Sequence, residues 1–323
     1  MYSIGIIGVG VLGKAIYETL NPIHTITVKC YDKYKTDYIK NNIYIKDINS
    51  LYHCDIIFLC LPTEYDNIKK AYNKTEIENV FNELAFINYK GILLLKSTVE
   101  PKTTYNLSKL YPCLNIIHNP EFLSAKTAHE DFKNQSHIVL GIPNYKYSDN
   151  NSDNNSDNNS DNNSDNNSGN SSDNNSDNNS GNSSDSSDNI NINKDITISY
   201  LKKFFTTYFK NITISICSSD ESESMKLFCN SFYATKIQFF TEIKMLCDNM
   251  NIEYNNVIKL MLNNGWINPM HTCIPGHDGE LSFGGACLPK DINALGSLCN
   301  NMNSTSEVIQ AVIAENKKMR NLL

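Results

Sequence analysis

The sequence lacks the patterns that mark several large classes of protein. Arg320 is the only arginine among 323 residues, so any phosphate must be bound by lysine, backbone N–H groups or hydroxyls. The ten cysteines include no C-x-x-C pair and no His/Cys cluster at zinc spacing, so we expect no metal site. The longest apolar runs, such as Ile56–Leu61, are too short to span a bilayer, and no basic signal region follows Met1. These absences predict a cytoplasmic protein with reduced cysteines and no membrane partner.

Charge is unevenly distributed along the chain. The formal net charge is -7, but residues 148–189 hold nine of the 35 acidic residues and no Lys or Arg. The rest of the chain, with 28 basic against 26 acidic residues, is close to neutral. A near-neutral folded part argues against a nucleic-acid partner.

Residues 148–189 repeat Ser-Asp-Asn-Asn with a period of four and contain no apolar side chain. Such a segment cannot bury enough surface to offset the entropy of ordering, so we predict that it is disordered. Long insertions in surface loops add little closure entropy, so we interpret it as an expanded loop within the first domain. Repeat expansion explains the insert better than a function of its own.

Short apolar runs alternate with helical patterns on both sides of this insert. Predicted strands are 2–7, 25–31, 55–61, 91–97, 114–118, 137–141 and 211–217, and predicted helices are 11–20, 76–87, 103–110 and 196–209. Apolar strands separated by helices predict a parallel sheet with helices on both faces. The first domain would then comprise residues 1–147 and 190–217.

Residues 218–323 show only helical patterns. Ser219 or Asp220 is a suitable cap, and acidic residues fill the first turn. Apolar residues then recur at three- and four-residue steps, at Met225, Phe228, Phe232, Phe239, Ile243, Leu246 and Met250. This predicts one helix of roughly 30 residues that acts as a domain spine and, through residues 220–250, as a homodimer contact. Shorter helices are expected at 253–263, 291–299 and 306–322.

The two parts together predict the fold class α/β, a Rossmann-type doubly wound parallel sheet followed by an all-helical domain.

A glycine fingerprint, Gly8-Val9-Gly10-Val11-Leu12-Gly13, follows the first strand and opens the first helix. These glycines permit the tight turn, the approach of a pyrophosphate and close helix–strand packing. Asp32 ends the second strand, where a carboxylate accepts hydrogen bonds from a ribose and repels a 2′-phosphate. The pattern favours NAD over NADP, and over a glycine turn in an unrelated α/β protein. Predicted cofactor-binding residues are Gly8, Gly10, Val11, Leu12, Gly13, Asp32, Pro62, Thr63, Ser97 and Lys290.

A second group of residues can carry chemistry. Cys287 lies in Phe283-Gly284-Gly285-Ala286-Cys287-Leu288-Pro289-Lys290-Asp291. Lys226 and Asn230 are four apart on the long predicted helix, so they share a face. A thiolate is a nucleophile, and a neighbouring cation such as Lys226 or Lys290 raises its fraction. Taken singly, each residue also has a purely structural interpretation. Lys226 could be a solvated lysine, Glu121 a loop carboxylate and Cys287 a core thiol.

The order of these segments and their amino-acid sequences resemble those of the UDP-glucose dehydrogenase family of nucleotide-sugar dehydrogenases. The resemblance covers nearly everything outside the insert, including Lys96-Ser97-Thr98-Val99, Asn119–Leu123, Glu223–Asn230 and Phe283–Asp291. It implies the four-electron oxidation of UDP-glucose to UDP-glucuronate with two NAD. It also implies a role for each matched position. Cys287 would be the nucleophile, Lys226 and Asn230 would stabilise oxyanions, Asp291 and Thr98 would orient water, Glu121 would be the general acid/base, and Phe122, Leu123, Phe283, Gly284 and Gly285 would bind substrate.

The sequence departs from this family in three places. The family has a further nucleotide-binding domain after the cysteine motif, whereas 32 residues follow Asp291 here. Ala125-Lys126 stands where the family usually has Glu-Gly, and no arginine precedes the glycine-rich motif. These departures should weaken substrate binding more than thiol chemistry. They leave open a non-catalytic, NAD-binding dimer. A simple hydroxyacid dehydrogenase is disfavoured because it needs no cysteine motif.

Overall fold

The computed structural model describes residues 1–34, 45, 47–145 and 185–321. The chain divides into two compact units, residues 1–145 with 209–323, and residues 146–208. The predicted disordered insert lies outside the described residues as far as residue 184. Helix α5 (Asp185–Tyr208) begins eleven residues before the predicted start at Ile196. The last five residues of the insert, 185–189, are therefore helical and not disordered as predicted. The predicted domain boundary at residue 218 stays a prediction.

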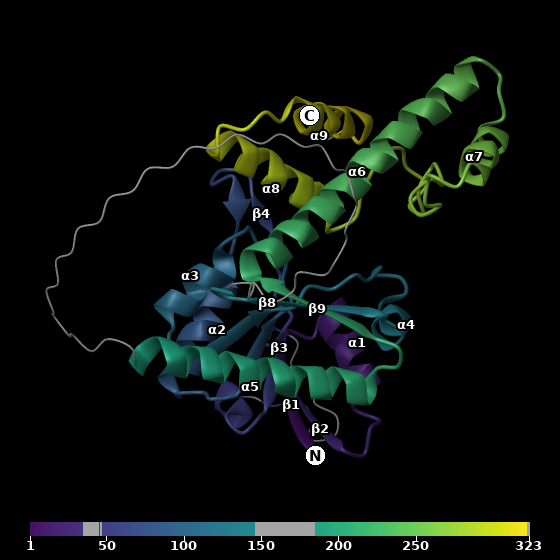
Figure 1. The fold of residues 1–323 in the computed structure, drawn as a ribbon. Coiled ribbons are helices and arrows are strands. Elements are labelled where there is room, and N and C mark those ends of the chain that lie inside the picture. The colour runs from purple at the N-terminus through teal and green to yellow at the C-terminus, as the bar shows by residue number, and fades with distance from the viewer. Residues whose placement is uncertain (35–44, 46, 146–184, 322–323) are drawn as a thin grey trace, which may run out of the picture. The chain divides into compact units, whose positions relative to one another are not determined.

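A seven-stranded sheet, in the order β2-β1-β3-β6-β7-β8-β9, lies at the centre of the larger unit (Figure 1). Its strands are β1 (Tyr2–Ile7), β2 (Ile26–Tyr31), β3 (Ile56–Leu59), β6 (Ile92–Leu95), β7 (Asn115–His118), β8 (His137–Ile142) and β9 (Thr213–Ser218). The four residues of β3 and of β6 are all buried, as expected for strands covered on both faces. The predicted Rossmann-type sheet is confirmed.

Helices cover both faces of this sheet. The first four are α1 (Val11–Leu20), α2 (Thr75–Phe86), α3 (Thr103–Leu110) and α4 (Ala128–Lys133). Figure 1 shows α2 and α3 on one side and α1 and α4, which pack together, on the other. Not predicted were α4, the short 3-10 helix Ile48–Leu51 and a hairpin of β4 (Tyr65–Asp66) and β5 (Ala71–Tyr72).

One part of the sheet differs from the prediction of uniformly parallel strands. β8 runs antiparallel to β7, and β9 is parallel to β8. The register pairs His118 with Gly141, so the beginning of β8 extends past the end of β7. It lies beside the turn that follows β7, where Asn119 Nδ2 donates to the carbonyl of Val139 at 2.8 Å. The antiparallel strand therefore lies beside the loop that follows β7 and accepts a hydrogen bond from it.

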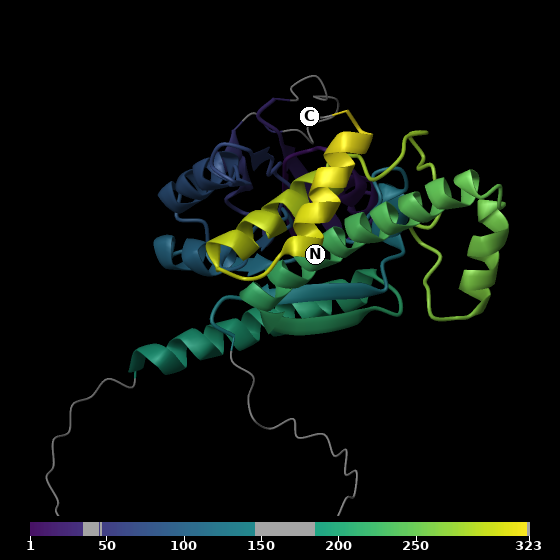
Figure 2. The same ribbon diagram turned by 90° about the horizontal axis from the view of Figure 1, so that it is seen from above.

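The remaining helices are α6 (Ser219–Asn249), α7 (Tyr254–Asn263), α8 (Leu288–Asn301) and α9 (Glu307–Met319). α6 has 31 residues and begins with a capping box formed by Ser218 and Glu221, so the predicted caps Ser219 and Asp220 were wrong by one and two residues. α8 and α9 lie along the first part of α6, and α7 packs at its far end (Figures 1 and 2). No helix among the described residues has the length and hydropathy needed to cross a membrane.

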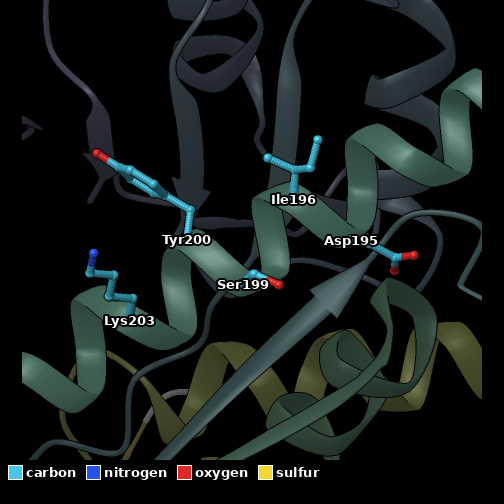
Figure 3. A pocket seen from close by; sticks show the side chains of 5 residues that line it. All are labelled: Asp195, Ile196, Ser199, Tyr200 and Lys203. Atoms are coloured by element: carbon cyan, nitrogen blue, oxygen red, sulfur yellow. The ribbon is translucent and has the colours of Figure 1, made fainter.

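A surface hollow lies on α5 in the smaller unit. Asp195, Ile196, Ser199, Tyr200 and Lys203 surround about 420 Å³ on α5 (Figure 3). All five residues come from one helix, and none was predicted to bind cofactor or substrate. We assign this hollow no function.

Candidate active site

The C-terminal ends of the parallel strands bring four predicted segments to one edge of the sheet. Gly8 follows β1, residues 61–63 follow β3, residues 97–98 follow β6 and residues 119–123 follow β7. Hydroxyl groups join neighbouring ends, since Ser97 Oγ donates to the Leu61 carbonyl at 2.7 Å and Thr63 Oγ1 to the Thr98 carbonyl at 2.7 Å. The strand order reverses at β1, and ligands of such sheets bind at this kind of edge.

The glycine turn fits a dinucleotide. Gly8 has φ +87°, and a Cβ on Gly13 would overlap the carbonyl oxygen of Gly8. A Cβ on Gly10 would meet no described atom within 4 Å, so this side of the turn is open. No side chain among the described residues caps the N-terminus of α1, which leaves its N–H groups to a phosphate. In the first turn of α1, Val11 is exposed and Leu12 half-buried.

Asp32 lies beside this turn, as predicted. Its Oδ2 accepts from the Val9 N–H at 2.7 Å, and its Oδ1 accepts from the Tyr34 N–H at 3.0 Å. Pro62 is exposed at the same edge of the sheet. The residues that follow β1 and β2 therefore suit the adenosine and pyrophosphate portions of NAD.

Successive turns of α6 carry buried polar side chains from the sheet toward α8. Ser222 Oγ lies 2.7 Å from His118 Nδ1 on β7. One turn on, Lys226 Nζ lies 3.4 Å from Glu121 Oε1. After another turn, Asn230 Nδ2 donates to Asp291 Oδ2 at 2.6 Å. Lys226 and Asn230 therefore lie on the same buried face, as predicted, and bridge the loop after β7 to α8.

The Glu121–Lys226 pair has the properties of a proton-transfer site. Burial lowers the pKa of Lys226, but the negative charges of Glu121, Asp291 and the Cys287 thiolate outweigh it and raise that pKa above its usual value. Glu121 Oε2 is buried and has no hydrogen-bond partner among the described residues. A carboxylate oxygen in this state is able to accept a proton from a substrate hydroxyl.

Asp291 is fully buried and is the most heavily bonded side chain of the site. In addition to Asn230, its carboxylate accepts from Tyr72 Oη at 2.5 Å and from Lys290 Nζ at 2.6 Å, both on Oδ1. Tyr72, from β5, was not predicted, because nothing in local spacing links it to α8. Lys290, predicted to bind cofactor, forms an ion pair with Asp291, and its cofactor contact stays a prediction.

Cys287 is the N-cap residue of α8 and is exposed on one side. Burial by the protein on its other side raises the pKa of the Cys287 thiol, and Asp291 and Glu121 raise it further. Lys290 and Lys226 lower this pKa, as predicted, but do not outweigh the other groups. The two lysines therefore act on the thiol in the predicted direction, while burial and the two carboxylates, which the sequence did not bring into account, act against them.

Lys96 is a second residue that the sequence did not single out, although it stands in the quoted Lys96-Ser97-Thr98 segment. It is 1% exposed, and its Nζ donates to Asn119 Oδ1 at 3.0 Å and to the Pro120 carbonyl at 3.3 Å. Burial lowers the pKa of Lys96 to about 8, while Glu121 partly restores it. This lysine holds the turn that presents Glu121.

The predicted substrate-binding residues are divided between surface and core. Phe122 and Gly285 are exposed, and Leu123 is half-buried. Phe283 is 2% exposed in a core cluster with Ala234, Ile292, Val312 and Ile313, so its ring packs in the core, and its contact with substrate stays a prediction. Gly284 lies against the guanidinium of Arg320.

Arg320 joins the end of α9 to the loop before Cys287. Its Nη1 lies 2.7 Å from Asp278 Oδ2, and its Nη2 donates to the Ser282 carbonyl at 2.8 Å. The only arginine thus holds the glycine-rich loop. No group of three or more His, Cys, Asp or Glu side chains among the described residues is arranged to hold a metal ion.

Two models of one protein family match the chain. Residues 31–153 match the NAD binding domain of the UDP-glucose/GDP-mannose dehydrogenase family, and residues 220–318 match its central domain. The predicted cofactor, NAD, is confirmed by the first match.

Similar proteins point in the same direction. UDP-glucose 6-dehydrogenase of Campylobacter jejuni is 24% identical over 98% of this chain and 72% of its own length. The enzyme of the same name from Rickettsia bellii is 25% identical over 84% of this chain and 51% of its own length. The chain therefore spans about half to three quarters of the length of these relatives.

Two solved structures share the fold. A UDP-glucose dehydrogenase from Pyrobaculum islandicum gives a TM-score of 0.71 at 17% identity, over 98% of this chain and 68% of its own. A 3-hydroxyisobutyrate dehydrogenase from Mycobacterium tuberculosis gives 0.66 at 11% identity, over 98% of this chain and 94% of its own. At these identities the likeness concerns the fold alone.

Proposed function

This chain belongs to the UDP-glucose/GDP-mannose dehydrogenase family, and from this we propose that it is an NAD-dependent oxidoreductase of a nucleotide sugar. The proposed substrate is UDP-glucose and the proposed product UDP-glucuronate. The observation that carries the proposal is the convergence of Glu121, Lys226, Asn230, Asp291 and Cys287 from three separate elements. A base, two oxyanion donors and a nucleophile at one place are what oxidation of an alcohol to an acid needs.

Bound NAD would supply the acceptor for the hydride removed in each of two oxidations. The residues that would hold it are those of the glycine turn, Asp32, and the ends of β3 and β6, which are Pro62, Thr63 and Ser97. The open side of the turn at Gly10 and the uncapped start of α1 support this placement.

The protein groups have complementary tasks at the reacting carbon. Glu121 takes the proton of the sugar hydroxyl when the alcohol becomes an aldehyde. The Cys287 thiolate then adds to the aldehyde carbon, and the new oxyanion is met by Lys226 and Asn230. After the second oxidation the carbon is a thioester, and water, oriented with the help of Thr98 and Asp291, releases the acid and the thiol. Phe122, Leu123 and the backbone of Gly284 and Gly285 would line the sugar site.

The test is substitution of the nucleophile. Cys287→Ser should abolish UDP-glucuronate formation, by about a thousandfold or more, because a serine hydroxyl is far less ionised than a thiol. The product is quantified by mass spectrometry and NADH by absorbance, with UDP-glucose and NAD as substrates.

Cys113→Ser is the matched control, because Cys113 is an exposed cysteine on the loop before β7. It should keep wild-type turnover. A folded, NAD-binding wild type that forms no NADH from UDP-glucose, and that Cys287→Ser leaves unchanged, would contradict the proposal.

One observation favours a second candidate, a non-catalytic NAD-binding protein. Burial raises the pKa of the Cys287 thiol, which reduces the thiolate available at neutral pH. Alkylation of Cys287 by iodoacetamide, followed with and without NAD, separates the two. In the enzyme, NAD and a UDP-sugar change the alkylation rate, whereas in the binding protein a UDP-sugar has no effect.

We further propose that the protein is a homodimer through α6. Phe228, Phe232, Phe239, Leu246 and Met250 are all exposed on this helix. Contiguous exposed apolar side chains of this size are typical of interaction surfaces. A second copy of the same helix is an occupant that matches such a surface in chemistry and length.

All ten cysteines are free, and the cytoplasm, which keeps thiols reduced, is the proposed compartment.

A further inference from the structure

We propose that Tyr72 is a positioning residue for the thiol chemistry, acting through Asp291 on Asn230 and Cys287. The inference rests on the proposed function and adds to it a residue of the β4–β5 hairpin. Its basis is the hydrogen bond from Tyr72 Oη to Asp291 Oδ1 at 2.5 Å, between two buried side chains 219 residues apart.

The position of the Tyr72 hydroxyl is fixed from both ends of the residue. Its backbone N–H donates to Glu100 Oε1 at 2.7 Å, and Glu100 is in turn held by Lys74 at 2.7 Å. Its ring packs with Leu227 of α6 and Ala294 of α8. These contacts hold the hydroxyl in position beside Asp291.

Tyr72 acts as a donor throughout the physiological pH range. Burial raises the pKa of its phenol well above 10.0, and the neighbouring charge of Asp291 raises it further. A phenol in this state gives a hydrogen bond to the carboxylate and does not compete with Glu121 as a base.

The hydrogen bond from Tyr72 to Asp291 affects two groups of the proposed reaction, the Asn230 amide and the Cys287 thiol. Asp291 Oδ2 accepts from Asn230 Nδ2 at 2.6 Å, so the orientation of the carboxylate fixes the amide that would meet the oxyanion. The negative charge of Asp291 also raises the pKa of the Cys287 thiol. A donor on Asp291 offsets part of that charge and so favours the thiolate.

The same hairpin offers a matched control. Tyr65 Oη lies 2.6 Å from Ser297 Oγ, so a second tyrosine hydroxyl joins the hairpin to α8. This contact joins two neutral hydroxyl groups and does not involve Asp291. Tyr65→Phe and Tyr72→Phe each remove one hydroxyl between the same two elements and keep the packed ring.

The first measurement is the rate of iodoacetamide alkylation of the Cys287 peptide as a function of pH, with no sugar present. In Tyr72→Phe the alkylation profile should move to higher pH, with a rate about threefold lower at neutral pH, which corresponds to about half a pH unit. Tyr65→Phe should follow the wild type. Equal profiles for Tyr72→Phe and wild type, or equal shifts in both variants, would overturn the inference.

The second measurement is steady-state oxidation of UDP-glucose. Tyr72→Phe should lower kcat by about tenfold and leave the KM values for UDP-glucose and NAD unchanged, since a hydrogen bond to a charged group has been removed away from either ligand. A loss confined to KM counts against a positioning role. Because alkylation needs no sugar, a wild type inactive on UDP-glucose defeats the proposed function, while the alkylation profiles still decide the role of Tyr72.

Discussion

At the scale of single residues, the candidate site depends on charged groups held away from water. Lys96, Lys226 and Asp291 are all buried. The negative charge of Glu121 raises the pKa of both lysines. Burying a charge is costly unless hydrogen bonds and opposite charges compensate. Lys96 obtains two acceptors from the turn that it supports, and its lowered pKa shows that the compensation is incomplete.

Lys96 therefore makes stability depend on pH in an alkaline window. Its pKa is about 8 in the folded protein against 10.5 for an ordinary lysine, so above pH 8 the unfolded chain binds more protons there. Stability from this group is lost as pH falls from 10.5 to 8, by up to about 3 kcal/mol. In Lys96→Met this part of the dependence should vanish in urea unfolding measured across that range.

The control for this prediction is Lys90→Met, because Lys90 is exposed just before β6. Its unfolding free energy should vary with pH as in the wild type. If Lys96→Met and wild type have parallel curves from pH 8 to 10.5, the buried lysine does not have the lowered pKa.

Sequence reasoning at this scale succeeds where a residue type and its segment carry the information. The sequences of the motifs predicted five site residues that the structure brings together, Cys287, Lys226, Asn230, Glu121 and Asp291. Tyr72 was not named and Lys96 was not singled out, because their importance comes from contacts across 219 and 23 residues. Such contacts follow from tertiary packing, which no local period or spacing reports.

At the scale of elements, α6 buries many polar side chains and exposes much of its apolar stripe. Its buried residues include the polar side chains Ser222, Glu223, Lys226, Asn230 and Ser231 alongside a few apolar ones. The apolar stripe that predicted the helix is exposed over much of its length. The period of 3.6 residues was read correctly, but which face lies inside could not be predicted, because polar side chains are buried only when tertiary partners satisfy them.

Glu223 shows how α6 completes another helix. α3 has no side-chain cap of its own, since its N-cap is Lys102, and Glu223 Oε1 accepts from the N–H and the hydroxyl of Thr104, at 2.7 and 2.5 Å. Burial raises the pKa of Glu223 to about 8, although these hydrogen bonds lower it. A carboxyl from one helix thus caps the next while remaining largely protonated at neutral pH.

This carboxyl gives a second pH-dependent term with the opposite sign to that of Lys96. With a folded pKa of about 8 against 4.5, the folded state binds the extra proton between these values. Stability from Glu223 is therefore full below pH 4.5 and is lost as pH rises to 8, at about 1.4 kcal/mol per pH unit. Glu223→Gln, which keeps the acceptor oxygen, should remove this slope in thermal unfolding followed by circular dichroism.

Glu242→Gln is the comparison variant, because Glu242 is an exposed carboxylate on the same helix. It should retain the wild-type slope between pH 4.5 and 8. A Glu223→Gln protein whose Tm falls with pH as steeply as that of the wild type would show that Glu223 is ionised in the folded state.

At the scale of the whole molecule, the exposed stripe of α6 is the proposed contact between two copies of the chain. Phe232 is 62% exposed near the middle of the stripe. Phe232→Asp should weaken self-association by about a hundredfold, because a desolvated charge replaces a central aromatic contact. Sedimentation velocity over a range of protein concentrations measures the change.

Phe86→Asp provides the reference, since Phe86 is an exposed phenylalanine at the end of α2. It should sediment as the wild type does. A wild type that remains monomeric at every concentration, or equal effects of the two substitutions, would show that α6 does not join two copies.

The hairpin contact with α8 has a consequence for synthesis on the ribosome. Tyr72 and Asp291 are 219 residues apart, so at ordinary elongation rates about 10 to 45 seconds separate their translation. Throughout that interval the nascent chain has a hairpin whose phenol lacks its acceptor. The segment with the glycine turn is therefore synthesised well before Cys287, and Cys287 is followed within four residues by Asp291, the acceptor that completes the contact with the hairpin.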